Sequence, residues 1–97
     1  MKSYARILMF LALTGSVNAR DLSQDEALRL REQGRIIPLE QLLSLVNARH
    51  PQASLLEVEL EADDDIYIYE VELATRDGVV RELEIDASTG KILQDEE

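Results

Sequence analysis

Cysteine and tryptophan are absent from this 97-residue chain. Without cysteine, the chain has no disulfide, no thiol redox chemistry and no thiolate metal site. The single histidine, His50, has no second imidazole with which to form a metal site or a catalytic pair. The chain also lacks a glycine-rich phosphate loop, and none of its serines has the sequence context of a nucleophile. We therefore expect a protein that is not an enzyme and that carries no cofactor.

Positive charge is scarce, because 10 lysines and arginines face 20 aspartates and glutamates. Residues 57–97 hold fifteen acidic and three basic residues, whereas residues 20–56 hold five of each. Nucleic acids and anionic membranes bind clustered lysine and arginine, so neither is expected as a partner. The charge is compatible with a cation or with the basic surface of another protein.

The longest apolar run at the N-terminus covers only residues 7–13. Lys2 and Arg6 precede or border it, and a stretch of small and polar residues follows it and ends at Ala19. This order is typical of a secretory signal peptide, and a bilayer span needs about 20 apolar residues. We therefore expect residues 1–19 to be a signal peptide cleaved after Ala19. The mature chain would lie in the periplasm or outside the cell, with no stable membrane anchor.

Two helices are predicted before residue 51. Ser23 and Glu26 have the spacing of a capping box, and Gly34 suits the left-handed residue after a last turn. We assign residues 20–36 to this short helix and a connector. The second helix starts at Pro38, a residue favoured at the first helical position, and stops before Pro51. Its buried face is predicted from apolar residues at helical spacing, Leu39, Leu42, Leu43 and Val46.

After Pro51 apolar and polar residues alternate, which is the pattern of a half-buried strand. Three strands are predicted, and "KIL" near the end of the chain could add a fourth. The predicted fold class is α+β: one main helix, plus the short N-terminal helix, packs on one face of a three- to four-stranded antiparallel sheet. Residues 37–97 would form this domain, with Tyr67 and Tyr69 on its inward face.

The strand registers follow from keeping the apolar residues on one face. A four-residue loop over residues 62–65 would pair Leu60 with Tyr67 and place Glu57 opposite Glu70. A three-residue loop over residues 76–78, with Gly78 in the left-handed conformation, would pair Val71 with Leu83, Tyr69 with Ile85, Glu70 with Glu84 and Glu72 with Glu82.

The other face of this sheet is predicted to be acidic, and directly opposed like charges destabilise a sheet. The face is either a solvated surface that keeps an exported domain soluble or a docking surface for a basic protein. A partner would bind the face itself or add a strand to an open sheet edge. Leu55 and Ile66 would share this face, and Ile68 and Val80 would be exposed apolar anchors. The candidate partner-binding residues are Glu57, Glu59, Ile68, Glu70, Glu72, Val80, Glu82 and Glu84.

Three adjacent carboxylates, Asp63, Asp64 and Asp65, are candidate ligands for a divalent cation. Calcium loops space their ligands along the chain, and here neither the glycine nor the distal glutamate of such a loop follows. A solvated turn is the preferred interpretation. An acidic, Ca²⁺-responsive protein is kept as the alternative function.

Several segments together resemble the PepSY domain family: "PLEQLLSLVNARHP", "YEVEL" over Tyr69–Leu73, the Asp77-Gly78 turn, and "RELEIDASTGKIL" over Arg81–Leu93. The resemblance covers residues 37–93 and implies a small α+β fold without catalytic residues. It also implies a role in regulating a protease or a signalling protein of the cell envelope, with the oligomeric state left open. The matching motif positions, to which it gives fold roles, are Tyr69, Val71, Gly78, Asp86, Thr89 and Gly90.

Overall fold

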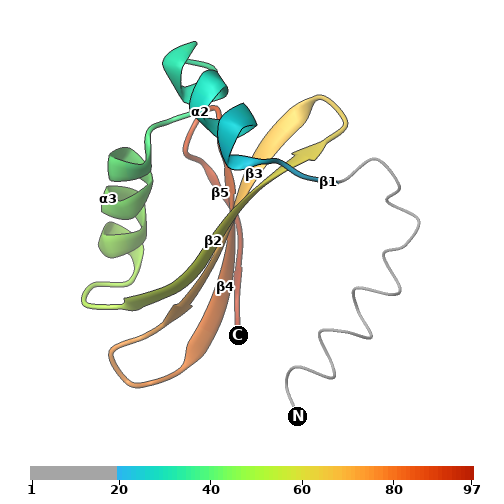
Figure 1. Ribbon diagram of the computed structural model, residues 1–97. Helices are drawn as coiled ribbons and strands as arrows, with labels where there is room; N and C mark the ends of the chain where they lie inside the picture. Colours follow the sequence, from blue (N-terminus) through green and yellow to red (C-terminus); the bar gives the residue numbers. More distant parts are fainter. Residues whose placement is uncertain (1–19) are drawn as a thin grey trace.

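Residues 20–97 are described by a computed structural model (Figure 1), and the predicted signal peptide lies outside these residues. An antiparallel sheet of five strands in the order β1-β2-β3-β4-β5 is accompanied by two helices, which makes the fold α+β. The elements are β1 (Arg20–Asp21), α2 (Gln24–Glu32), α3 (Leu39–Arg49), β2 (Ser54–Asp63), β3 (Ile66–Ala74), β4 (Val80–Asp86) and β5 (Ile92–Glu96).

The predicted capping box of α2 is confirmed. The Glu26 amide donates to the Ser23 hydroxyl over 3.1 Å, and the Ser23 amide donates to the Glu26 carboxylate over 3.1 Å. Together these bonds satisfy two amides that the first turn of a helix leaves without partners. Gly34 follows the helix with φ of +71°, as predicted. Ala27 and Leu30 are buried, so this short helix takes part in the core.

The predicted buried face of α3 is confirmed only in part. Leu42 and Val46 are buried, whereas Leu39 and Leu43 are 42% and 45% exposed. Leu45 packs against the core instead, because that flank of the helix lies against the turn between β4 and β5. The helix itself begins at Leu39, one residue later than expected, with Pro38 as its N-cap.

The central strand β3 holds the core together. Tyr69, Val71 and Leu73 are each at most 1% exposed, and residues of both helices and of β2 and β4 belong to the same apolar cluster. The Tyr69 hydroxyl donates to the Ile37 carbonyl over 2.8 Å and accepts from Arg31 Nε over 3.1 Å. A buried hydroxyl without partners would be costly, and these two bonds satisfy it while they fix α2 and the segment after it to the sheet.

The two predicted strand pairings, β2 with β3 and β3 with β4, differ in outcome. The predicted pairing of β3 with β4 is confirmed, including Val71 with Leu83 and Tyr69 with Ile85. The predicted pairing of β2 with β3 is wrong by two residues, because Leu60 pairs with Tyr69 and not with Tyr67. Asp64 adopts φ of +55°, a conformation that aspartate tolerates, and so closes a turn of two residues where four were expected. A shift of two residues keeps each side chain on its predicted face.

The sheet has five strands, not the three or four that were predicted. β1 is only two residues long, so no alternation could reveal it, and β5 corresponds to the strand expected around "KIL". A register shift in β2 between Leu55 and Glu57 makes Leu56 an extra residue and pairs Leu55 with Leu73. This bulge moves Leu55 to the core side of the sheet, where the regular alternation had placed it on the acidic side.

An ion-pair cluster fixes β5 to the rest of the fold. The Asp95 carboxylate accepts from Arg49 Nε over 2.8 Å, lies 2.9 Å from His50 Nε2 and accepts from Arg81 Nε over 2.8 Å. Although the burial of Asp95 acts in the opposite direction, these hydrogen bonds lower the pKa of its carboxyl to about 2. The end of α3, the start of β4 and the end of β5 are thus tied at one charged group.

The turn between β4 and β5 gives the "DASTGK" segment a structural role. Asp86 Oδ1 accepts from the Ser88 amide over 2.8 Å and from the Thr89 amide over 3.2 Å. Gly90 then adopts φ of +84°, and a Cβ built on it would lie 2.9 Å from Leu45 Cδ1. Glycine is therefore favoured at position 90 for two reasons: it adopts the left-handed conformation easily, and it leaves room for Leu45 of α3.

Substitution of Gly90 is expected to destabilise the protein more than substitution of Gly78. Gly78 also has a positive φ, +87°, but a Cβ there would meet nothing within 4 Å. Gly78→Ala should therefore lower the free energy of unfolding by ~1 kcal/mol through backbone strain alone. Gly90→Ala should cost about 1 kcal/mol more, because Leu45 must move. Equal losses in urea unfolding would contradict the packing role of Gly90.

Candidate functional site

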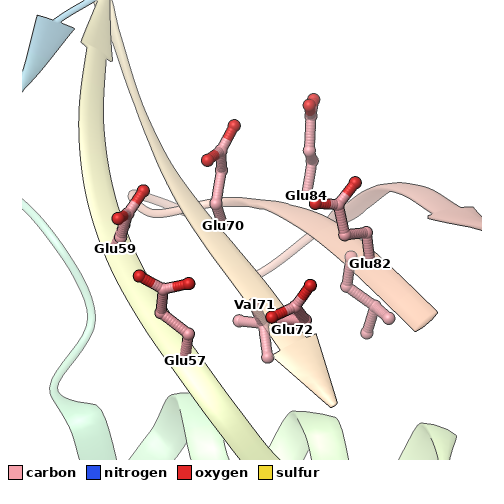
Figure 2. A pocket seen from close by; sticks show the side chains of 8 residues that line it. Glu57, Glu59, Glu70, Val71, Glu72, Glu82 and Glu84 are labelled. Carbon is pink, nitrogen blue, oxygen red and sulfur yellow. The ribbon is translucent and has the colours of Figure 1, made fainter. Parts of the chain in front are cut away.

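One side of the sheet carries a dense array of carboxylates, which we call the acidic face (Figure 2). The face is formed by alternate residues of β2, β3 and β4, whose side chains stand on the side away from the buried core. In Figure 2, Glu59, Glu70 and Glu84 come from three neighbouring strands and point to the same side. The acidic face consists of Glu57, Glu59, Glu61, Glu70, Glu72, Glu82, Glu84 and Asp86.

The register places glutamates of the acidic face directly opposite one another in two rows across the sheet. Glu59 pairs with Glu70 and Glu70 with Glu84 in the first row. The second row contains Glu57, Glu72 and Glu82 and continues to Glu96 of β5. The predicted pairs Glu70 with Glu84 and Glu72 with Glu82 are confirmed, whereas Glu57 lies opposite Glu72 and not Glu70. By this register, no lysine or arginine of strands β1–β5 occupies a position on the acidic face.

Glu70 is the electrostatic centre of the acidic face. Partial burial raises the pKa of its carboxyl to about 8, together with the negative charges of Glu61, Glu84 and Glu59 and a hydrogen bond with Glu61. The same hydrogen bond acts to lower the pKa of Glu61, so Glu70 is the partner that holds the proton. Near neutral pH, Glu70 is therefore largely protonated in the free protein.

The pKa values of three carboxyls near Glu70 are also raised. Burial raises the pKa of Glu84, helped by the charge of Glu82. Burial also raises the pKa of Glu61. At Glu59 a hydrogen bond with Glu57 is the main cause of a raised pKa. The fold thus holds these carboxyls in a place where their ionised forms are disfavoured.

The glutamates enclose a shallow hollow of about 80 Å³ on the acidic face. The hollow is open to solvent and too small for a substrate of ordinary size. It is lined by Glu57, Glu59, Glu70, Val71, Glu72, Glu82, Leu83 and Glu84. The arrangement provides many negative charges and few apolar contacts, which suits the recognition of positive charge more than that of a small apolar ligand.

The two predicted apolar anchors differ. Val80 is 36% exposed at the start of β4, where a partner could contact it. Ile68 is only 7% exposed, so the prediction that it is an exposed anchor is wrong. It lies on the central strand between Glu61 and Asp86, with neighbours on both sides, and the partial exposure that was expected belongs to Ile66 at the strand end.

The predicted cation ligands do not gather around one point. Asp64 and Asp65 are exposed in the turn between β2 and β3, and Asp63 ends β2. Within residues 20–97, carboxylate oxygens approach within 4.8 Å of one another at a different place, formed by Asp21, Glu59 and Glu61. No sequence pattern indicated this group, because Asp21 joins it only through the two-residue strand β1. Exposed acidic groups of this kind are common without an ion, so the group alone does not establish a metal site.

Comparison with known families gives one match. The model of the family described as PepSY, "Peptidase propeptide and YPEB domain", matches residues 36–96, which is most of the chain. Among curated proteins and solved structures, none matches the chain. Neither helix in residues 20–97 is long and apolar enough to cross a membrane.

Removing the charge of Glu70 is expected to stabilise the protein at alkaline pH. In the unfolded chain the pKa of this glutamate returns to its ordinary value of 4.5, well below the value of about 8 in the fold. The favourable contribution of the protonated group is complete below pH 4.5 and is lost as the pH rises through 8. Glu70→Gln should therefore raise the free energy of unfolding at pH 8.5 by ~2 kcal/mol, less than the full pKa shift would give because solvent screens a carboxyl that is only partly buried. The effect at pH 5 should be much smaller.

A matched control is Glu32→Gln, which removes one carboxylate from the exposed end of α2. Its effect in chemical unfolding should be small and similar at both pH values. A Glu70→Gln effect that does not change with pH would show that Glu70 ionises normally in the fold.

Proposed function

Because the chain belongs to the PepSY family, we propose that it is an exported regulatory module that binds a protease or an envelope signalling protein through its acidic face. The family description, which names peptidase propeptides, supports a protease-regulatory role. PepSY domains are typically extracellular or periplasmic, which supports export after cleavage following Ala19. Residues 20–36 would precede the PepSY-like domain over residues 37–97.

The observation that carries the proposal is the opposition of glutamates across three neighbouring strands. Like charges in directly opposed positions destabilise a sheet, and partial burial adds to the cost. Substitution of some of these glutamates by lysine or threonine would relieve the repulsion without disturbing the core. A surface on which this repulsion persists is explained if the basic surface of a partner brings positive charge next to it.

A basic partner would change the ionisation of the acidic face. Lysine or arginine beside Glu70 favours the ionised carboxylate and so lowers its pKa from about 8. Binding near neutral pH then releases a proton, and the complex becomes tighter as the pH rises toward 8. Opposite charge on the two surfaces also speeds their association, mainly at low salt. Regulation would follow from occupying the basic surface of the partner, since the module needs no catalytic group of its own.

Divalent cation binding is the alternative function, and the approach of Asp21, Glu59 and Glu61 favours it. A cation at this position would neutralise carboxylates without any protein partner. Millimolar Ca²⁺ should then raise the melting temperature of the wild-type protein but not of Asp21→Asn. The protein-binding proposal predicts no such difference.

Crosslinking from the acidic face tests the protein-binding proposal. A photoreactive residue replaces Glu57 in one variant and Glu40, on the exposed surface of α3, in the other. Both replacements remove one carboxylate, so the net charge stays matched. Crosslinking in the cell envelope should capture a partner from position 57 and not from position 40.

The captured partner is then purified, and its association rate with the wild-type protein is measured at low and high salt. The rate should fall by about tenfold or more between ~50 and ~500 mM salt. Double charge reversal at Glu57 and Glu59 should slow association, whereas reversal at Glu32 and Glu40 should not. Equal capture from both positions, or a rate that salt does not change, would contradict binding through the acidic face.

A further inference from the structure

Strand β2 forms an open edge of the sheet over more than half of its length. β1 covers only the last part of β2, where Arg20 pairs with Ala62 and Asp21 with Glu61. The Leu22 amide then donates to the Leu60 carbonyl over 2.9 Å, after which the chain turns into α2. Within residues 20–97, no strand pairs with the outer side of β2 from Ser54 to Glu59. We call this segment the open edge.

The backbone of the open edge is oriented to receive another strand. The Leu60 carbonyl points outward, because it accepts from Leu22. Amide and carbonyl groups of alternate residues in a strand point to the same side. The N–H and C=O of Val58 therefore also point outward, whereas Glu57 and Glu59 direct theirs toward their partners on β3.

The side chains of the open edge differ on its two sides. On the acidic face it carries Glu57 and Glu59. On the core side Leu55 is 42% exposed, and Val58 is only half-buried although its partner Val71 on β3 is buried. Leu56, the extra residue of the bulge, is 53% exposed. Apolar surface at the edge of a core is thus left uncovered where the sheet ends.

Further exposed apolar surface lies on α3. Leu39 and Leu43 are one helical turn apart and are 42% and 45% exposed. Leu43 lies about 160° around the helix from Leu45, which meets the turn before β5. The flank that carries Leu39 and Leu43 therefore turns away from β5, toward the side on which β2 ends the sheet.

We propose that the open edge binds an extended peptide segment of a partner as an added strand, in which basic residues alternate with apolar ones. This inference rests on the proposed function and names its mode of binding. Backbone hydrogen bonds to Val58 would hold the segment, as in other cases of strand addition. Its basic side chains would lie beside Glu57 and Glu59, and its apolar side chains beside Leu55 and Val58.

Charge decides between this partner and a second copy of the protein. Two copies joined through their open edges would bring the glutamates of both β2 strands side by side, which is unfavourable. Acidic residues and a bulge are also the devices by which edge strands avoid pairing with themselves. A basic segment does not meet the charge obstacle, because its lysine or arginine side chains would attract the glutamates of β2.

The opposite edge of the sheet is less suited to the same role. On the core side of β5 the Asp95 carboxylate is already bound by Arg49, His50 and Arg81. Polar or charged residues, Gln94, Asp95 and Glu96, therefore occupy both sides of that edge. Over these three residues that edge offers no alternation of apolar and acidic surface to an incoming strand, and the apolar residues of β5, Ile92 and Leu93, lie only at its start.

The test uses residues 20–97 and a capped peptide of about six residues in which lysine alternates with valine. NMR amide exchange should show that the Val58 amide becomes protected when the peptide binds. Methylation of the peptide amides that face β2 should weaken binding by about tenfold or more, whereas methylation of the other amides should not. A peptide of glutamate alternating with valine should not bind.

Two variants of the protein test whether the Val58 N–H is needed for peptide binding. Val58→Pro removes the outward N–H, and an edge strand tolerates proline where the N–H faces solvent. It should lose peptide binding, and Val58→Thr, which keeps the N–H and the branched side chain, should retain it. If Val58→Pro does not fold, the methylated peptides decide.

Equal binding of both methylated peptides would overturn strand addition. So would an unprotected Val58 amide, or a dimer of the protein that the lysine peptide does not dissociate. In these cases a partner captured from position 57 with a salt-dependent rate would still support the acidic face. Failure of the inference and failure of the proposed function are therefore distinguishable.

Discussion

Burial of alternate residues along β3 is the constraint on which the rest of the structure depends. Tyr69, Val71 and Leu73 are enclosed by both helices and by residues of the neighbouring strands. A slip of one residue would expose this entire set, so the register of the central strand is strongly determined. The same register places Glu70 and Glu72 opposite glutamates of β2 and β4. Burial of the apolar core thus stabilises a fold in which the glutamates of the acidic face repel one another.

The sheet is divided into two chemically opposite sides, and the proposed function depends on that division. The core side gives stability, while the acidic face and the open edge of β2 are left to interact. Near neutral pH the proton on Glu70 limits the repulsion, so the free protein tolerates the face. In the proposed complex, a basic partner would supply positive charge in place of that proton. Under the proposed function, the choice of partner would depend on electrostatics more than on a shaped pocket.

The sequence predicted the features that residue spacing determines, and it missed those that depend on local backbone conformation or on contacts between distant segments. The capping box of α2 and the pairing of β3 with β4 could be read from residue spacing and from Gly78. The tight turn at Asp64 and the bulge before Glu57 could not, because both depend on backbone conformations that several residue types adopt. The alternation of apolar and polar residues correctly placed the glutamates of the acidic face on the side of the sheet away from the core. It could not show that Ile68 is covered or that Asp21 joins Glu59 and Glu61, since these follow from neighbours supplied by other strands.

The most direct test of the central claim is the titration of the Glu70 carboxyl in the free protein, followed by the NMR chemical shift of its side-chain carbon. We predict a midpoint at about 8, because burial and the surrounding carboxylates disfavour the ionised form of Glu70. We also predict that Glu61→Gln, which removes one of these charges, moves the midpoint downward. A midpoint near 4.5, the ordinary value for glutamate, would contradict the claim that the fold holds these charges together at a cost.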